Sequence, residues 1–339
     1  MIQAGRHRLR IATFNVENLG APVETEATLD ERIRLLRPQL LRLRADILCL
    51  QEVDSQRQSS KKDRALEIME ALLAGTPYEA YHRATTVSRT TGAVRDKHNL
   101  VTLSRAPLLE QRQVFHDLVS PPRHRLATTP SDDGGHAIEW DRPFLHVTVR
   151  LDCGRVLHVL NVHLRAPRAA FLADQKTNAR TWRTMSGWAE GFFLAAVKRS
   201  GQALEVRLFV DQVFDDDAHA LIVVCGDFNA DTHEVPVRTI RGDEEDAGNP
   251  HLILRTLVPV ERSVAHSRRF SVVHHGRPQM LDHLLVSRPM LAWYRGVEIH
   301  NEALGDELLT SHAVHGSPES YHAPVVAEFL LSGVNDAAF

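Results

Sequence analysis

The run Leu221–Asp231, which reads LIVVCGDFNAD, constrains the fold of this chain more than any other stretch. Its apolar residues at 221–225 predict a strand buried on both faces, because a short β-branched run bounded by a glycine is typical of such strands. Gly226 permits a tight backbone path, and Asp227 and Asn229 follow at alternate positions, so both side chains point the same way on an extended backbone. A carboxylate and an amide therefore leave one strand end together, either as an ordinary polar turn or as part of a site.

A second strand of this kind lies near the start of the chain. The alternating run Leu9–Phe14 predicts a strand with polar side chains from Asn15 onward, and residues 28–43 carry apolar positions at helical spacing. The buried run Ile47–Leu50 follows, so strand, helix and strand predict a crossover unit. Glu52 comes directly after this run. It is either an exposed loop residue or the ligand of a cation, since a buried carboxylate needs a partner.

Polar side chains flank further predicted strands. Residues 143–164 alternate apolar and polar residues around a central turn, which predicts a hairpin whose second strand ends in His163. Near the C-terminus, Asp282 opens another apolar run, and His322 precedes the last predicted strand, Val325–Leu330. Strands therefore recur with the same kinds of side chain at their ends, and the whole pattern predicts an α/β fold.

The length and composition favour one globular domain. The 339 residues are 43% hydrophobic and 24% charged, which is ordinary for such proteins. No repeat or linker interrupts the chain, so we expect a single domain over residues 1–339, with a mainly helical insertion at about 168–218. The insertion mixes basic and aromatic residues. This mixture is typical either of a groove that follows a nucleic-acid strand or of helices with core aromatics and solvated cations.

Charge and apolar patterning exclude several classes of protein. A formal net charge of -3 argues against bulk coating of nucleic acid but leaves a local basic groove possible. No apolar run approaches the ~18 residues of a membrane span, and the first residues lack the apolar core of a signal peptide. We therefore expect a cytoplasmic location, and no obligate protein partner is evident. Cys49, Cys153 and Cys225 lack the spacing of a zinc site and predict packed free thiols.

The polar strand ends stand in six motifs. In chain order they read TFNVEN, LQEVD, NVHL, GDFNA, LDHLLVS and SYHAPVVAEF. In kind and order they resemble the endonuclease/exonuclease/phosphatase superfamily, whose fold is that of deoxyribonuclease I. The resemblance extends from near residue 11 to near residue 330. It implies a four-layer α/β sandwich, in which two mixed β-sheets pack face to face with helices outside, and a cleft where the strand ends meet.

The resemblance also implies a metal-dependent phosphodiester hydrolase and a role for each matching residue. Asn15 and Glu52 would hold Mg²⁺ or Mn²⁺, since hard cations prefer amide and carboxylate oxygens. Asp227 would orient and deprotonate the attacking water, and Asn229 would donate a hydrogen bond to the scissile phosphate. The metal would neutralise the charge that develops on the phosphate oxygens.

The remaining matches concern histidines. Asp282 would accept a hydrogen bond from one nitrogen of His322 and so turn the other nitrogen toward a phosphate oxygen. His163 matches the histidine that lies on the leaving-group side in the deoxyribonuclease I branch, where it would act as general acid.

One position departs from the family pattern. The family usually has Ser-Asp-His near the C-terminus, and this chain has Ser320, Tyr321 and His322. A phenol with a pKa of about 10 is a poor ligand for Mg²⁺ at neutral pH. Either Glu52 carries the metal largely alone, or a neighbour such as Glu319 compensates, or activity is reduced.

The motifs leave the substrate open, because specificity lies in the loops between strands. The first expectation is a phosphoester substrate, with nucleic acid the leading candidate and nuclease action the leading activity. The alternatives are a phosphatase or phosphodiesterase of a small phosphorylated metabolite or lipid headgroup, and a catalytically weakened binding module in which Tyr321 replaces the usual Asp.

Overall fold

Two six-stranded mixed sheets form the centre of the computed structural model, which describes residues 7–20, 29–57, 64–129, 135–178, 181–306 and 319–331. The first sheet has the order β17 (Tyr294–Ile299), β18 (Val325–Leu331), β1 (His7–Leu19), β2 (Ile47–Val53), β6 (Asn99–Ser104) and β5 (His82–Thr85). The second has the order β13 (Leu257–Pro259), β16 (Asp282–Ser287), β12 (Leu221–Asp227), β11 (Val156–His163), β10 (Phe144–Arg150) and β7 (Leu108–Val114).

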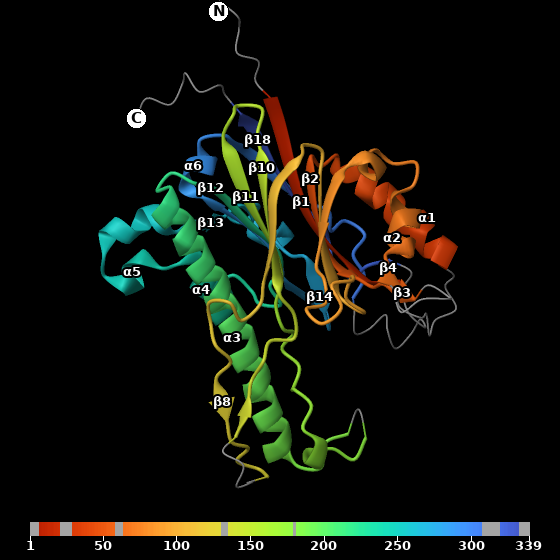
Figure 1. Cartoon of the computed structure of the whole chain (residues 1–339), viewed down its shortest axis with the longest axis vertical. Helices are drawn as coiled ribbons and strands as arrows, with labels where there is room; N and C mark the ends of the chain where they lie inside the picture. The colour runs from red at the N-terminus through yellow and green to blue at the C-terminus, as the bar shows by residue number, and fades with distance from the viewer. Residues whose placement is uncertain are drawn as a thin grey trace, which may run out of the picture.

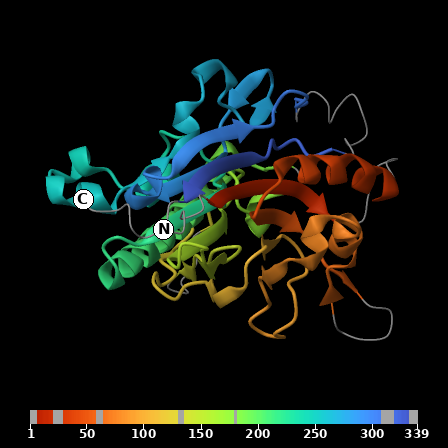
Figure 2. The same cartoon turned by 90° about the horizontal axis from the view of Figure 1, so that it is seen from above.

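The helices cover the outer faces of the two sheets. Helices α1 (Leu29–Leu43) and α2 (Glu67–Leu73) lie on one side, and α3 (Met185–Asp216) and α4 (Val235–Arg241) on the other (Figure 1). Seen from above, the strands lie between α1 and α3 (Figure 2). The other short elements of the described residues are strands β3 (Gln56–Arg57), β4 (Arg64–Ala65), β8 (Arg123–His124), β9 (His136–Ala137), β14 (Val272–His274) and β15 (Arg277–Gln279) and helices α5 (Glu244–Ala247) and α6 (Arg288–Leu291). They also include 3₁₀ turns at Pro77–Ala80, Ala173–Gln175, Pro250–Arg255, Val260–Ser263 and His266–Arg268.

Three apolar clusters hold the four layers together. The central cluster joins the facing sides of the sheets through residues such as Ile11, Val159 and Val223. A second cluster packs α1 and α2 on the first sheet, and a third packs α3 and α4 on the second, with Leu40 and Val210 as buried examples. Burial of these faces stabilises the fold by roughly 25 cal/mol per Å² of apolar surface. The predicted four-layer α/β sandwich is confirmed.

Two parallel crossovers position the strand ends. Strand β1 pairs in parallel with β2 across α1, and β11 pairs in parallel with β12 across α3. The carboxyl ends of all four strands therefore meet at one edge of the two sheets. The helix predicted at 28–43 is present as α1, and residue 28 itself lies outside the described residues.

A buried polar contact joins the two sheets beneath this edge. Gln51, next to Glu52 in β2, donates from Nε2 to Asn161 Oδ1 of β11 at 2.7 Å. Asn161 Nδ2 in turn donates to the backbone oxygens of Leu50 and Val101 at 3.2 and 3.1 Å. Both amide side chains are fully buried, and buried amides with their hydrogen bonds made fix the position of the groups around them.

Cys49 and Cys225 are buried in the central cluster, Cys153 is partly buried, and all three are free thiols, as predicted.

Helix α3 is longer than the sheet that it covers. Its C-terminal half packs on the second sheet. Its N-terminal half projects downward in Figure 1 together with the β8–β9 excursion. We call this projection the arm; it comprises the described residues of 116–141 and 165–200. Segment 168–184, ahead of α3, contains a 3₁₀ turn. Among the described residues, no helix combines the length and apolar character needed to cross a bilayer.

Glu190 is one of the α3 carboxylates that fasten the excursion to this helix, beside Glu205. Glu190 of α3 accepts hydrogen bonds from the backbone N–H of Ala127 (2.6 Å) and Thr128 (2.9 Å) and from His124 Nε2 (2.8 Å). Burial raises the pKa of Glu190, but the bonds from Thr128, His124 and Ala127 outweigh it and lower the pKa to about 2. A lowered carboxyl pKa stabilises the fold above the unfolded value of 4.5, and this stabilisation is lost as the pH falls toward 2.

Glu190→Gln is therefore expected to loosen the arm at neutral pH while the sheets stay intact. Hydrogen bonds to a charged acceptor are worth roughly 1.5–3 kcal/mol, so we expect hydrogen exchange at the amides of Ala127 and Thr128 to accelerate by about tenfold or more. Glu139→Gln, at an exposed position of the same excursion, is the matched control. Unchanged exchange in the Glu190 variant, or equal acceleration in both, would contradict this fastening role.

Candidate catalytic site

The register of the second sheet places three predicted residues side by side. His163 at the end of β11 pairs with Asp227 at the end of β12, and Asp227 pairs with Asp282 at the start of β16. The path through Gly226 has φ of +143°, and a Cβ atom there would lie 1.9 Å from the backbone oxygen of Val162. Only glycine meets both conditions, which explains why this residue stands directly before Asp227.

Gly226→Ala is consequently expected to destabilise the protein by roughly 2–5 kcal/mol, from backbone strain and overpacking together. Gly296→Ala on edge strand β17 is the matched control, because a Cβ atom there meets nothing within 4 Å. Urea unfolding of both variants measures the difference. A Gly226 variant as stable as its control would show that the strand end is not constrained in this way.

The first sheet contributes the groups that face Asp227. Asn15 of β1 donates from Nδ2 to Asp227 Oδ2 at 3.0 Å and to Glu52 Oε1 of β2 at 3.2 Å. Its Oδ1 accepts the backbone N–H of Glu17 at 2.9 Å. The amide nitrogen of Asn15 thus lies between two carboxylates from different sheets, where it reduces their repulsion. The role of Asn15 as a metal ligand stays a prediction, and in this arrangement its oxygen faces the backbone.

Asp227 is held from several sides. The backbone N–H of Asn229 donates to Oδ1 at 2.8 Å, and Asn229 Nδ2 donates to Oδ2 at 3.0 Å and to the backbone oxygen of Leu164 at 3.1 Å. Burial raises the pKa of Asp227 to about 7, with the charge of His322 opposing the increase and that of Asp282 adding to it. Asn229 is therefore engaged in holding the carboxylate, in addition to the phosphate contact predicted for it.

His163 lies between this carboxylate and an arginine. Its Nε2 is 3.3 Å from Asp227 Oδ2 and 3.6 Å from Glu52 Oε1, and its Nδ1 contacts Nη1 of Arg142. Burial lowers the pKa of His163 well below its usual value, and the charges of Arg142, His98 and His322 add to this effect. A neutral ring with Nδ1 accepting leaves Nε2–H as the donor toward the carboxylates.

Asp282 and His322 form the predicted dyad. His322 Nδ1 lies 2.8 Å from Asp282 Oδ2. Burial opposes protonation of His322, but the charges of Asp282, Asp227 and Glu17 raise its pKa well above the usual value. Among the described residues, Asp282 Oδ1 is buried and accepts no hydrogen bond. A positively charged imidazole is thus held at the cavity, beside a carboxylate oxygen that still has acceptor capacity.

Tyr321, where the chain departs from the family pattern, contacts Glu17, a carboxylate to which the motifs assign no role. The side chain of Tyr321 is buried, and its backbone N–H donates to Glu17 Oε2 at 2.7 Å. Burial raises the pKa of Glu17, and among its charged neighbours are His322 and Glu52. Glu319, the neighbour suggested from the sequence, lines a different depression. Glu17 therefore supplies a second carboxylate on the first-sheet side of the site.

Backbone conformation at the site is unusual. Within the described part of the chain, five non-glycine residues with positive φ line one cavity, namely Glu17 (48°), Asn18 (50°), Glu52 (60°), His98 (53°) and Asn229 (47°). Such conformations cost of order 1–3 kcal/mol each and persist where the surroundings impose them, most often at functional sites. Their gathering at one cavity supports a functional interpretation.

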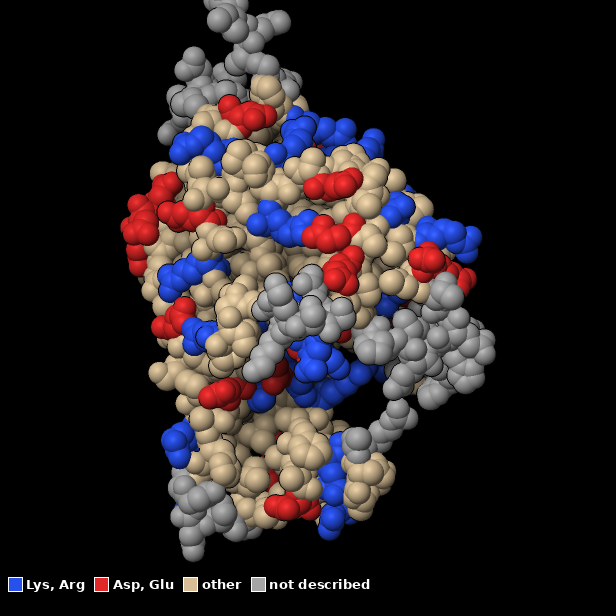
Figure 3. Space-filling model, turned by 45° about the vertical axis from the view of Figure 1, so that its right-hand side comes forward, with Lys and Arg blue, Asp and Glu red and all other residues tan. Residues whose placement is uncertain are grey.

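This cavity has a volume of about 650 Å³. Its lining contains Glu52, His163, Asp227, Asn229 and His322 of the predicted set, while Asn15 and Asp282 lie beneath it in contact with these residues. The lining also contains arginines at 142, 165 and 168. In Figure 3, Lys and Arg side chains gather beside a hollow between the main body and the arm. The predicted residues thus come together at one place.

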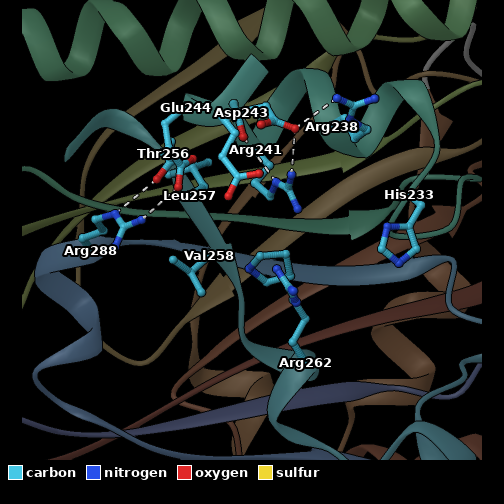
Figure 4. Close-up of a pocket in the computed structure, with 13 residues that line it drawn as sticks. His233, Arg238, Arg241, Asp243, Glu244, Thr256, Leu257, Val258, Arg262 and Arg288 are labelled. Carbon is cyan, nitrogen blue, oxygen red and sulfur yellow. Dashed lines mark hydrogen bonds and ion pairs between the residues drawn. The ribbon is translucent and has the colours of Figure 1, made fainter. Parts of the chain in front are cut away.

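A depression of about 460 Å³ elsewhere on the molecule has a different character (Figure 4). Asp243 accepts from Arg238 at 3.0 Å and from Arg241 at 3.3 Å, and Arg288 lies 3.8 Å from Glu244. Its charges largely pair with one another. Since none of the predicted site residues lines it, the catalytic candidate is the cavity at the strand ends.

Comparison with known proteins agrees with this geometry. The model of the Endonuclease/Exonuclease/phosphatase family matches residues 12–317. The chain belongs to this family. None of the curated proteins matches it.

Solved structures of the endonuclease/exonuclease/phosphatase fold match over nearly the whole chain. Truncated TDP2 from Caenorhabditis elegans has 14% identity and a TM-score of 0.54, over 96% of this chain and 98% of that one. A family protein from Bacteroides thetaiotaomicron has 13% identity and a TM-score of 0.57, over 97% and 99%. The 3' phosphatase NExo from Neisseria, solved with a product DNA hairpin, has 19% identity and a TM-score of 0.50, over 95% and 99%. At these identities the likeness establishes the fold.

The donor set is suited to the divalent cation on which this family generally depends. Glu52 and Glu17 offer carboxylate oxygens from the first sheet, and Asp227 and Asp282 offer them from the second, with Asp282 Oδ1 lacking a hydrogen-bond donor. Ligand atoms of Asp227, Asp282 and His322 lie within 4.8 Å of one another, as do those of Glu52, His98 and His163. Carboxylate-rich sites of this kind favour hard cations such as Mg²⁺ and Mn²⁺.

Sequence reasoning misses Glu17, His98 and Arg142 among the residues at this site. Glu17 stands two positions after Asn15, as Asn229 stands two positions after Asp227, and this shared spacing is the one sequence signal for it. Both residues have positive φ, so the alternation of an extended strand does not by itself place their side chains. His98 lies just before β6 with Nδ1 3.7 Å from Glu52 Oε2, and Arg142 precedes β10. No motif marks these last two, because their places depend on how loops fold over the strand ends.

Proposed function

We propose that this protein is a metal-dependent phosphodiester hydrolase. The observation that carries the proposal is the meeting, at one cavity, of the Asn15–Glu52 pair from the first sheet with Asp227 and the Asp282–His322 dyad from the second. The site combines carboxylates that share an amide, a charged histidine beside them and a lining rich in arginine. Such a site is suited to bind a phosphate ester and to stabilise the negative charge that develops on it during hydrolysis.

Each residue has a task that its contacts support. Asp227, with a pKa of about 7, is suited to take the proton of the attacking water at neutral pH, and Asn229 keeps it in place. His322 would donate from Nε2 to a phosphate oxygen while Asp282 fixes the ring. His163, as a neutral ring, would donate from Nε2–H on the leaving-group side. A Mg²⁺ or Mn²⁺ ion held by Glu52 and Glu17 would supply Lewis-acid stabilisation of the phosphate charge.

Nucleic acid is the first substrate class to test. Arginines at the cavity would neutralise backbone phosphates, and the fold neighbour NExo was solved with DNA. A small phosphorylated metabolite or lipid headgroup is the second candidate, favoured by the bounded volume of about 650 Å³. A binding module is the third, and Glu17 weakens its basis because that residue provides a carboxylate near Tyr321.

Hydrolysis assays of the purified protein with Mg²⁺ or Mn²⁺ separate these candidates. The substrates are DNA, RNA, bis-p-nitrophenyl phosphate and inositol phosphates. Cleavage of the model diester without either nucleic acid would rule out nuclease action. Failure to hydrolyse any substrate, together with no change in thermal stability on adding Mn²⁺, would leave the binding module as the better explanation.

A further inference from the structure

A second pocket lies in the arm, beside the catalytic cavity. It has a volume of about 470 Å³. Its apolar lining comes from the β8–β9 excursion, the loop ahead of α3 and α3 itself, through Leu126, Ile138, Ala170, Phe171, Leu172 and Leu194. The catalytic cavity, in contrast, is lined mainly by charged and polar groups. We call this second space the arm pocket.

The two spaces adjoin at one arginine. Arg165 lines both the catalytic cavity and the arm pocket. Asp141, in the arm pocket, holds Arg165 Nη1 at 2.9 Å and Lys198 Nζ at 2.8 Å, and it directly precedes Arg142 of the catalytic cavity. The chain from Arg165 to Phe171 likewise begins in one space and ends in the other. A phosphate in the catalytic cavity therefore has an apolar space next to it.

The arm pocket is built from an apolar cluster of its own. Ile138, Ala170, Leu172 and Leu194 form a core cluster separate from the three that hold the sheets. Yet the cluster leaves a hollow large enough for a ligand group, since small-molecule sites typically measure ~300–1,000 Å³ with a mainly apolar lining. Glu190, bonded to His124 of the same lining, keeps the excursion against α3. The hollow is thus maintained by specific contacts.

We propose that the arm pocket binds an apolar or aryl group esterified to the phosphate, while the phosphate itself lies in the catalytic cavity. This inference rests on the proposed function and narrows its substrate class. Water in an apolar hollow is readily displaced by apolar groups, and each buried CH₂ contributes about 0.8 kcal/mol. Alkyl groups, as in lipids, and aromatic groups share this chemistry.

Calorimetric binding of phosphonates to the full chain with Mn²⁺ tests the proposal independently of turnover. The probes are methylphosphonate, hexylphosphonate and phenylphosphonate, which share one charged group and differ in the organic substituent. Hexyl or phenyl is expected to bind at least about tenfold more tightly than methyl. A preference for hexyl indicates a lipid-like group, and a preference for phenyl indicates an aryl group.

Two variants locate the effect in the arm pocket. Ala137→Leu, at an exposed position of β9, reduces the hollow and should bring hexyl and phenyl affinities close to that of methyl. Phe171→Ala removes an aromatic ring that is 67% exposed at the pocket, so folding is preserved, and should weaken phenylphosphonate several-fold. Trp188→Ala is the matched control, because Trp188 is another exposed aromatic of the arm and does not line the pocket.

The outcomes separate this inference from the proposed function. Equal affinities for the three phosphonates, with bis-p-nitrophenyl phosphate still hydrolysed, would overturn the arm pocket as a subsite and leave the hydrolase intact. Tighter hexyl or phenyl binding that Ala137→Leu abolishes would support the subsite even if no diester were hydrolysed, in which case the hydrolase proposal would fail. Loss of the preference in Trp188→Ala as well would place the binding elsewhere and overturn the inference.

Discussion

Asp227→Asn is expected to lower kcat on any diester substrate by about 10²–10⁴-fold, because a positioned general base contributes a factor of this size. The carboxylate is buried, its pKa is raised to about 7, and it faces Asn15, His163 and Asn229 within 3.3 Å. An amide at this position accepts no proton from water. Initial rates with saturating Mn²⁺ measure the loss.

The first control for this prediction is a measurement that shows the variant to be folded. Asn has nearly the shape of Asp, so circular dichroism should stay close to that of the unaltered protein. The thermal midpoint should fall somewhat, because the new amide NH₂ faces groups that donate to Asp227. Asn249→Ala, at the exposed cap of the 3₁₀ turn Pro250–Arg255, is a matched surface change that should leave kcat unaltered. If Asp227→Asn retained more than about a tenth of the activity, the base would have to be another group, and the assignment of Asp227 would be wrong.

Much of the fold follows from sequence because its central strands are buried on both faces. The run at 221–225 has no polar interruption, and the structure places it in the centre of the second sheet. The crossover through α1 is likewise indicated by apolar spacing, even though Pro38 lies within the helix. Strand β1 is longer than predicted and spans His7–Leu19, because its pairing with β2 shifts register after Asn15 and resumes at Leu19. Periodicity therefore identifies strands better than it identifies their ends.

The site is only partly accessible to the same reasoning. Asp227, Asp282 and His163 lie side by side because of the register of their strands. The order of the motifs suggests that these residues meet, but only the hydrogen-bonded pairing of the strands establishes it. Arg142 and His98 lie in loops and reach the site from there. Nothing in the local sequence distinguishes them from the solvent-exposed arginines and histidines elsewhere in the chain. The arm shows the same limit. Its basic and aromatic residues are compatible with both a groove and a helix core. The pocket within it depends on contacts between distant segments, which the sequence does not indicate.

Glu52→Gln is expected to have the second large effect, an activity loss of at least about 10³-fold, because cation stabilisation of a phosphoryl transition state is worth several kcal/mol. Glu52 is mostly buried, it accepts from Asn15 and from the backbone N–H of Asn18, and its φ of 60° shows that the fold holds it in an unusual conformation. Gln removes the charge and keeps the size. Mn²⁺ affinity, measured by calorimetry, should fall together with the rate.

The comparison with Glu17→Gln determines how the chain accommodates Tyr321. If Glu17 shares the cation with Glu52, its variant should lose roughly 10–100-fold in Mn²⁺ affinity, and raising the Mn²⁺ concentration should restore much of its rate. If Glu52 holds the cation alone, Glu17→Gln should bind Mn²⁺ as the unaltered protein does. Glu319→Gln is the matched control, since Glu319 lines another depression. A loss of Mn²⁺ affinity in Glu319→Gln but not in Glu17→Gln would support Glu319, the residue suggested by the sequence, as the compensating ligand. It would contradict the role inferred for Glu17 from its hydrogen bond with the Tyr321 N–H.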